Sequence, residues 1–222
     1  MTRFVLVPGA GGVAWYWHRV VSLLEEARHQ AIAVDLPADD ESAGLAKYTE
    51  LTVTAIDGDA SSIIVAQSLG GFTGAMAAAR ARVSGLTFVN AMIPLPGERL
   101  GEWGAAVGST EARIAKAKRD GYSEEFDDAT YFYHDVSEDK VGAKLARAQS
   151  EKVFDDRADF TAWPKIPIRL LASASDRLFP IELQQRIARD RLGIDAEVIP
   201  GGHLVALSHP AELVAALLRR PA

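Results

Sequence analysis

Short runs of residues that are apolar on both faces alternate along this chain with amphipathic helical patterns. The helical patterns cover residues 15–28, 45–57, 69–80, 181–191 and 210–219. The apolar runs cover residues 3–7, 31–35, 62–66, 86–90, 166–172 and 197–199. Strands with two apolar faces are typical of parallel sheets that helices cover on both sides. The alternation therefore predicts an α/β fold with a mostly parallel sheet flanked by helices.

The alternation stops between Pro94 and Trp163. Helical patterns follow one another there, with no candidate strand between them, over residues 98–107, 110–119, 124–133 and 138–150. Residues 94–163 are therefore expected to form a helical cap inserted into a core made of residues 1–93 and 164–222. Because this insertion leaves the carboxyl end of one strand and returns before the next, it would cover the edge where open α/β sheets bind ligands.

Charge and residue content exclude several classes of function. The net charge of −6 gives no electrostatic reason to bind nucleic acid or an anionic membrane surface. The chain has no cysteine, so its chemistry must come from Ser, His, Asp and Glu, without a thiolate nucleophile or a cysteine-bound metal. No apolar run approaches the roughly 18 residues that a membrane span requires, and the first run is too short for a signal peptide. A cytoplasmic protein is expected.

One serine lies in a turn crowded with small residues. Ser68 belongs to the segment AQSLGG (66–71), directly after a predicted strand and directly before an alanine-rich helix. The nucleophile elbow G-x-S-x-G has this context, because a strained turn holds the serine hydroxyl at the upper edge of a sheet. Ala66 replaces the first glycine, which is a mild change at a position that needs a small side chain. The turn favours a catalytic serine, and a helix N-cap serine is the structural alternative.

A serine nucleophile needs a base, and His203 has the most suitable position of the five histidines. It follows a predicted strand through Pro-Gly-Gly (200–202), so it would reach the sheet edge at which Ser68 is displayed. The other histidines are expected to be surface or packing residues: His18, His29, His134 and His209.

The third member of a serine triad is a carboxylate that orients the imidazole and stabilises its protonated form. Asp176 follows a predicted strand, and the order Ser68, Asp176, His203 is the nucleophile–acid–base order of the elbow architecture. A capping role at the next helix, or pairing with Arg177, is the structural alternative for this residue. In that case the acid would be one of two other carboxylates, Asp35 or Asp135.

The first predicted strand ends in a glycine-rich turn, VPGAGG (7–12). This turn has neither the G-x-x-x-x-G-K-[ST] spacing of a phosphate-binding loop nor the G-x-G-x-x-G spacing of a dinucleotide site. We therefore expect no cofactor and no metal. An oxyanion hole needs two backbone N–H groups, one after the nucleophile and one from this first loop. The N–H groups of Leu69 and Ala10 are expected to fill that role.

With these motifs in this order, the chain resembles the α/β-hydrolase superfamily over nearly its whole length. FVLVPGA (4–10) and AWYW (14–17) are similar to the plant methylesterase and hydroxynitrile-lyase branch and its bacterial relatives, which usually carry F-V-L-V-H-G-A, a histidine and W-x-W. Pro8 and Gly12 replace the two histidines here, so the hydrogen bonds of this loop must differ. The resemblance implies an α/β-hydrolase fold with a helical cap, in a bacterial relative of that branch.

Within that branch, the resemblance favours an esterase over a lyase. Hydroxynitrile lyases of this type carry a threonine where this chain has Gly9 and a lysine where it has Leu204. The lysine stabilises departing cyanide, so an apolar residue removes a charge that the lyase reaction uses. The resemblance thus implies a serine hydrolase that cleaves a small carboxylic ester through an acyl-enzyme. The alternatives are C–C hydrolysis or acyl transfer on the same triad, and a non-catalytic ligand-binding protein on the hydrolase scaffold.

The insertion is expected to supply most of the pocket for a small apolar ester. Aromatic side chains of the insertion and the leucine after the candidate base are the expected lining, namely Trp103, Tyr131, Phe132 and Leu204. Packing of the insertion on the core is the alternative role for each aromatic residue. A homodimer remains one option for the oligomeric state.

Overall fold

The computed structural model of the protein describes residues 1–137, 144 and 147–219. One sheet has the strand order β2-β1-β3-β4-β5-β6, and every neighbouring pair of strands is parallel. The strands are β1 (Arg3–Val7), β2 (Gln30–Ala33), β3 (Ile63–Gln67), β4 (Gly85–Val89), β5 (Ile168–Ser173) and β6 (Glu197–Ile199). Each lies on the apolar run that predicts it, with ends that differ by a residue or two.

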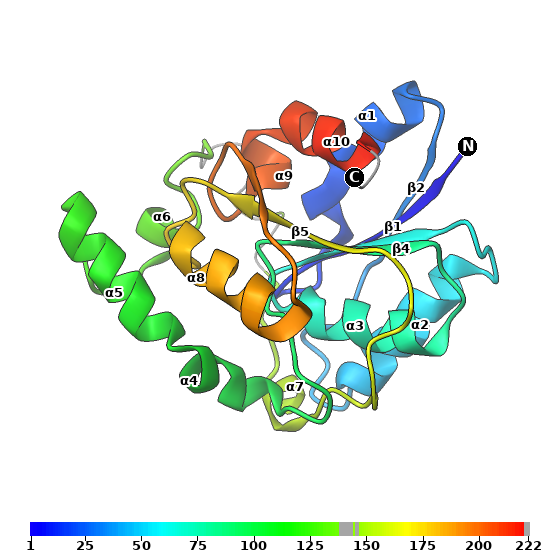
Figure 1. Ribbon diagram of the computed structural model, residues 1–222, viewed down its shortest axis with the longest axis horizontal. Helices are drawn as coiled ribbons and strands as arrows, with labels where there is room; N and C mark the ends of the chain where they lie inside the picture. The colour runs from blue at the N-terminus through cyan, green and yellow to red at the C-terminus, as the bar shows by residue number, and fades with distance from the viewer. Residues whose placement is uncertain (138–143, 145–146, 220–222) are drawn as a thin grey trace.

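Helices cover both faces of the sheet (Figure 1). One face carries η1 (Ala14–Trp17), α1 (His18–Glu26), α9 (Val205–Ser208) and α10 (Pro210–Leu218). The opposite face carries α2 (Leu45–Ile56), α3 (Gly70–Arg80) and α8 (Ile181–Ile187), which continues into a π-helical turn, η5 (Ala188–Leu192).

Strand β1 shows why the sheet is covered on both sides. Val5 and Val7 point into the apolar cluster beneath α2 and α3, whereas Phe4 and Leu6 point into the cluster beneath α1 and α10. All four side chains are buried. Because alternate residues of a strand face opposite ways, a strand that is apolar at every position requires a core on each face of the sheet.

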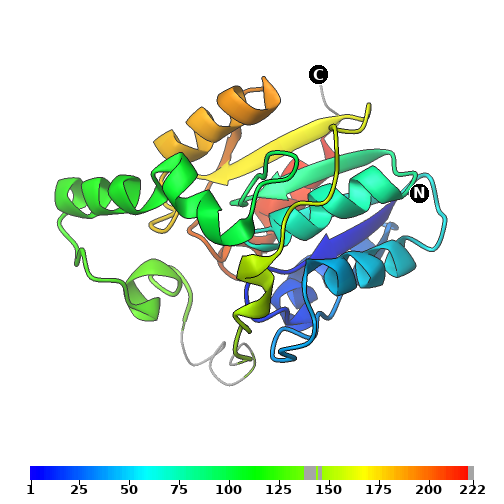
Figure 2. The same cartoon turned by 90° about the horizontal axis from the view of Figure 1, so that it is seen from below.

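Between β4 and β5 the described chain forms helices, loops and an isolated β-bridge between Arg99 and Arg157. The helices are η2 (Leu100–Glu102), α4 (Trp103–Val107), α5 (Ser109–Asp120), α6 (Asp128–Tyr131) and α7 (Lys152–Asp155). Helix α5 projects from the body of the molecule in both views (Figures 1 and 2). We call residues 94–163 the insertion; its role as a separate cap domain stays a prediction.

Two helices expected in the insertion differ from the structure. The helix expected over 124–133 is reduced to the single turn of α6, which begins after Asp127 because that carboxylate caps it by accepting the Thr130 N–H at 2.7 Å. The helix expected over 138–150 falls largely outside the described residues, and its end at 147–150 is irregular.

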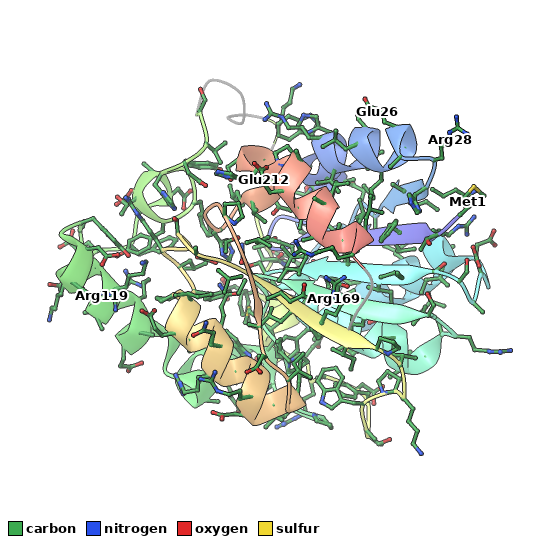
Figure 3. The ribbon with its side chains drawn as sticks, turned by 45° about the horizontal axis from the view of Figure 1, so that its top comes forward. Met1, Glu26, Arg28, Arg119, Arg169 and Glu212 are labelled. Atoms are coloured by element: carbon green, nitrogen blue, oxygen red, sulfur yellow. The ribbon has the colours of Figure 1, made fainter. Side chains whose placement is uncertain are left out.

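Charged side chains such as Glu26, Arg119 and Glu212 lie on the outside of α1, α5 and α10 (Figure 3). Within the described ranges, no helix has both the length and the apolar character needed to cross a bilayer. In the same ranges, no group of three or more His, Asp or Glu side chains is arranged to hold a metal ion.

Candidate active site

The loops that follow β1, β3, β5 and β6 meet at the carboxyl edge of the sheet. Strand β1 pairs with β2 on one side and with β3 on the other, so the chain changes direction across the sheet between β1 and β3. Open α/β sheets bind ligands at such a switch point. Ser68 directly follows β3 at this point, and the glycine-rich turn directly follows β1.

The turn at Ser68 is strained in the way a nucleophile elbow requires. Ser68 has a φ of 51°, which is rare for a residue with a side chain. A Cβ on Gly70 would lie 2.3 Å from the Pro8 carbonyl oxygen, so only glycine fits there. Helix α3 packs closely on β3, since a Cβ on Gly74 of α3 would lie 2.6 Å from the Ala66 Cβ. The small side chain of Ala66 suits this close contact.

Ser68 does not cap the helix that follows it. The N-cap position of α3 is Leu69, and no side chain caps this helix. Instead the Ser68 hydroxyl Oγ lies 3.0 Å from Nε2 of His203. Ser68 therefore does not have the helix N-cap role that was its structural alternative.

The ring of His203 bridges Ser68 and Asp176. Its Nδ1 lies 2.9 Å from Oδ2 of Asp176, and both side chains are almost fully buried, at 1% and 0% exposure. The other oxygen of Asp176, Oδ1, accepts the backbone N–H groups of Leu178 and Phe179 at 2.8 and 2.9 Å. These bonds hold the carboxylate in one orientation, so Oδ2 faces the imidazole. The three residues expected to form a triad are thus brought together.

A buried amide that the sequence analysis missed holds the backbone of the histidine loop. The side-chain amide Nδ2 of Asn90 lies 2.9 Å from the Ser173 hydroxyl, 3.1 Å from the Gly202 carbonyl oxygen and 3.2 Å from the His203 carbonyl oxygen. Asn90 follows β4 with a φ of 46°, a conformation that asparagine tolerates better than most residues. In the sequence, the only indication of this role is that an asparagine lies at the end of a predicted central strand.

The glycine-rich turn after β1 packs directly against the serine turn. A Cβ on Gly9 would lie 2.8 Å from the Ser68 Cβ, so the two backbones approach each other closely. Among the described residues, the N–H groups of Ala10 and Leu69 have no hydrogen-bond partner. Two unpartnered N–H groups beside the serine hydroxyl are what an oxyanion hole requires.

A cavity of about 400 Å³ opens above Ser68 and His203. The first loop lines one side through Gly9, Ala10 and Gly11. Two of the residues expected in the pocket, Phe132 and Leu204, line it, together with apolar Val13 and polar Asp128, Arg147 and Gln149. The Arg147 guanidinium is already paired, because it donates to Asp35 and to the Leu36 carbonyl oxygen. The lining is thus partly apolar and partly polar, with its arginine neutralised.

Two aromatic residues expected in the pocket lie elsewhere. Trp103 is buried, donates its Nε1–H to the Ile93 carbonyl oxygen at 3.0 Å and packs against the Phe179 ring. Tyr131 is also buried, and its ring stacks on Phe126. Trp103 thus belongs to the apolar cluster beneath α2 and α3, whereas Tyr131 packs against Tyr122 and Phe126 within the insertion. Neither ring lines the cavity.

The alternative acids have other partners. Asp35 accepts the Ala14 N–H at 2.9 Å and pairs with Arg147, whereas Asp135 accepts the Gly202 N–H at 2.6 Å.

The remaining histidines have contacts with residues other than Ser68. His18 stacks on Trp15, and His29 contacts Phe4. His134 and His209 lie near Gly202 and Gly201.

Comparison with known proteins gives the family. A model described as the alpha/beta hydrolase family matches residues 4–217. The chain belongs to that family. This alpha/beta hydrolase is 34% identical over 111 residues to "Probable esterase PIR7A" of Oryza sativa subsp. indica, a match covering 45% of the chain and 42% of the rice protein. It is 42% identical over 86 residues to "Norfluorocurarine synthase 2" of Strychnos nux-vomica, a match covering 34% of the chain and 32% of that protein.

Among solved structures, the alpha/beta hydrolase is similar to polyneuridine aldehyde esterase. The TM-score is 0.78 at 21% sequence identity, and the alignment covers 98% of each chain. This likeness shows the fold over 98% of the chain. In sequence, however, the matched stretch spans less than half the length of the curated relatives.

Proposed function

We propose that this alpha/beta hydrolase cleaves small carboxylic esters through an acyl-enzyme formed on Ser68. The observation that carries the proposal is the line of contacts from the Ser68 hydroxyl through His203 to Asp176, with heavy-atom distances of 3.0 and 2.9 Å. Both distances lie within hydrogen-bonding range, which a general base needs in order to take the serine proton.

In the first half of the reaction, the Ser68 Oγ attacks the ester carbonyl carbon while its proton passes to Nε2 of His203. The carbonyl oxygen becomes an alkoxide, which the N–H groups of Ala10 and Leu69 stabilise. Such donors contribute about 3–4 kcal/mol each to transition-state stabilisation. The carbon–oxygen bond to the alcohol then breaks, and the alcohol leaves with the proton from Nε2.

In the second half, a water molecule attacks the acyl carbon while Nε2 of His203 takes one of its protons. The tetrahedral intermediate collapses, the bond to Ser68 breaks, and the serine oxygen regains the proton from Nε2. The carboxylic acid is released. Asp176 holds Nδ1 of the ring throughout, which keeps the lone pair of Nε2 directed at the serine.

The size of the cavity and the names of the relatives support an ester of modest size. A volume of about 400 Å³ lies in the range of roughly 300–1,000 Å³ that is usual for small-molecule sites. The rice relative is named a probable esterase, and the structural relative is a polyneuridine aldehyde esterase. Phe132 and Leu204 provide apolar surface beside the candidate base for an acyl or alcohol group.

The test is hydrolysis of a panel of p-nitrophenyl esters with increasing acyl length by the wild-type protein and two variants. Ser68→Ala and His203→Ala should each lower kcat by several orders of magnitude, and combining them should cost little more, because nucleophile and base act as a unit. Absence of turnover in the wild type across the panel would contradict ester hydrolysis and favour a ligand-binding protein on this scaffold. Turnover retained by Ser68→Ala would contradict the serine mechanism.

A further inference from the structure

Two side chains of the insertion contact the two loops that carry the proposed machinery. Asp135 accepts the backbone N–H of Gly202, the residue before His203, with a distance of 2.6 Å. Gln149 accepts the backbone N–H of Gly11, the residue after Ala10, with a distance of 3.2 Å. Neither side chain touches Ser68 or the imidazole of His203 in these contacts. Both act on backbone atoms one residue away from a proposed catalytic group.

The loop that carries His203 is held from both sides. Asn90 of the core binds the carbonyl oxygens of Gly202 and His203, while Asp135 of the insertion binds the Gly202 N–H. The contact is close, because a Cβ on Gly202 would lie 2.7 Å from Oδ1 of Asp135 and 2.5 Å from Nε2 of His134. A backbone fixed at its N–H and at its carbonyl groups leaves the imidazole little freedom to shift relative to Ser68.

The glycine-rich turn is held by a second contact of the same kind. Gln149 uses its Oε1 to accept the Gly11 N–H, and its Nε2 donates to the Tyr48 hydroxyl at 3.2 Å. Tyr48 lies on α2 and is 1% exposed, so it is a fixed anchor for the amide. Ala10, the residue before Gly11, lines the cavity, and its N–H has no hydrogen-bond partner among the described residues.

We propose that Asp135 and Gln149 are positioning residues. Through them the insertion holds the loop that carries His203, and the glycine-rich turn that carries the Ala10 N–H, in the correct position relative to Ser68. This inference rests on the proposed function, because it assigns the two residues to the same site. Both act through a hydrogen bond to a neighbouring backbone N–H, so their removal should slow the chemical step. Asp135 is not among the residues that line the cavity, so its removal should leave substrate binding largely intact, whereas Gln149 also lines the cavity. Misplacement of a catalytic group by about 1 Å is enough to cost roughly 10²-fold in rate.

The structure offers a matched control in Asp156. It also belongs to the insertion and accepts a core backbone N–H, that of Leu45, at 2.7 Å. Its side chain is 22% exposed, against 17% for Asp135. The difference is the location, since Leu45 begins α2 and lies outside the candidate active site. Asp156→Ala therefore removes the same kind of bond without touching either loop.

The experiment measures kcat and KM for p-nitrophenyl acetate, the rate of labelling by a serine-directed phosphonate, and the melting temperature. Asp135→Ala and Gln149→Ala should each lower kcat and the labelling rate by about 10- to 100-fold, with little change in KM for Asp135→Ala. Asp135→Asn retains an acceptor oxygen and should recover most of the loss. Asp156→Ala should lower the melting temperature and leave kcat unchanged.

The outcomes separate this inference from the function on which it rests. An active wild type, together with folded Asp135→Ala and Gln149→Ala variants that match Asp156→Ala in kcat and labelling, would overturn the positioning role alone. A wild type that is neither active nor labelled would overturn the proposed function and this inference with it. If Asp135→Ala does not fold, Gln149→Ala applies the same test to the other loop. A loss that appears only in KM would also overturn the inference.

Discussion

Oδ2 of Asp176 lies 2.9 Å from Nδ1 of His203, on the side of the imidazole away from Ser68. The same carboxylate holds two backbone N–H groups at the start of the next loop through Oδ1. Sequence alone presents orientation of the histidine and capping of the next helix as alternatives. The carboxylate orients the histidine with Oδ2 and holds the loop before α8 with Oδ1, whereas no side chain caps α8 itself. Ionised carboxylates have enough acceptor sites for this, whereas an amide has only one oxygen.

The Asp176→Asn variant is therefore expected to fold normally and to have a much lower kcat. The asparagine oxygen can still accept the N–H groups of Leu178 and Phe179, but its NH2 group then faces Nδ1 of His203. That arrangement favours the tautomer with the proton on Nε2, which cannot act as the base. We expect kcat to fall by up to roughly 10⁴-fold, as in the best-studied serine triad, with a small change in melting temperature. Turnover near the wild-type value would remove Asp176 from the mechanism.

Trp103 and Phe132 have different surroundings, so replacing each with alanine should have a different effect. Trp103 is buried in the core cluster beneath α2 and α3, so Trp103→Ala should lower the free energy of unfolding by about 3–5 kcal/mol, as measured by urea denaturation. Phe132 lines the cavity, so Phe132→Ala should raise KM for esters with longer acyl chains and change stability less. Equal KM values for the wild type and Phe132→Ala across the ester panel would argue against this lining.

His134 should make the stability of the protein depend on pH. Burial lowers the pKa of the His134 imidazole below its ordinary value of 6.5, and the nearby Asp135 offsets only part of this effect. The unfolded chain therefore binds a proton more readily than the folded chain. The stabilising contribution is complete above about pH 6.5 and is lost as the pH falls through the lowered pKa. His134→Gln should show a smaller fall in melting temperature between about pH 8 and pH 5; an identical fall would contradict the prediction.

The sheet and the catalytic turn could be predicted because their signals are local. A short run that is apolar at every position, such as 63–66, is typical of a strand that is covered on both faces. Small residues around Ser68 mark a sharp turn, because larger side chains would collide with Pro8 and with the neighbouring strand. Pro8 is distant in the chain, but the small residues that accommodate it lie within a few positions of Ser68, so the sequence shows this signal directly.

The supporting contacts of the site could not be predicted because they join distant parts of the chain. Asp135 and Gln149 reach backbone groups 67 and 138 residues away, and no local pattern identifies the partner. The same reason explains the misplaced Trp103. An aromatic residue on a short helix has the same local pattern whether it faces a cavity or a core, and only the packing of the insertion on the sheet decides between them.

The most direct test of the account is the mass of the protein after reaction with a serine-directed phosphonate. The wild type should gain one phosphonyl group, and peptide mapping should locate it on Ser68, because the hydroxyl beside Nε2 of His203 is the activated nucleophile. Ser68→Ala should gain none under the same conditions. An adduct on another residue, or equal labelling of Ser68→Ala, would contradict the assignment of Ser68 as the nucleophile.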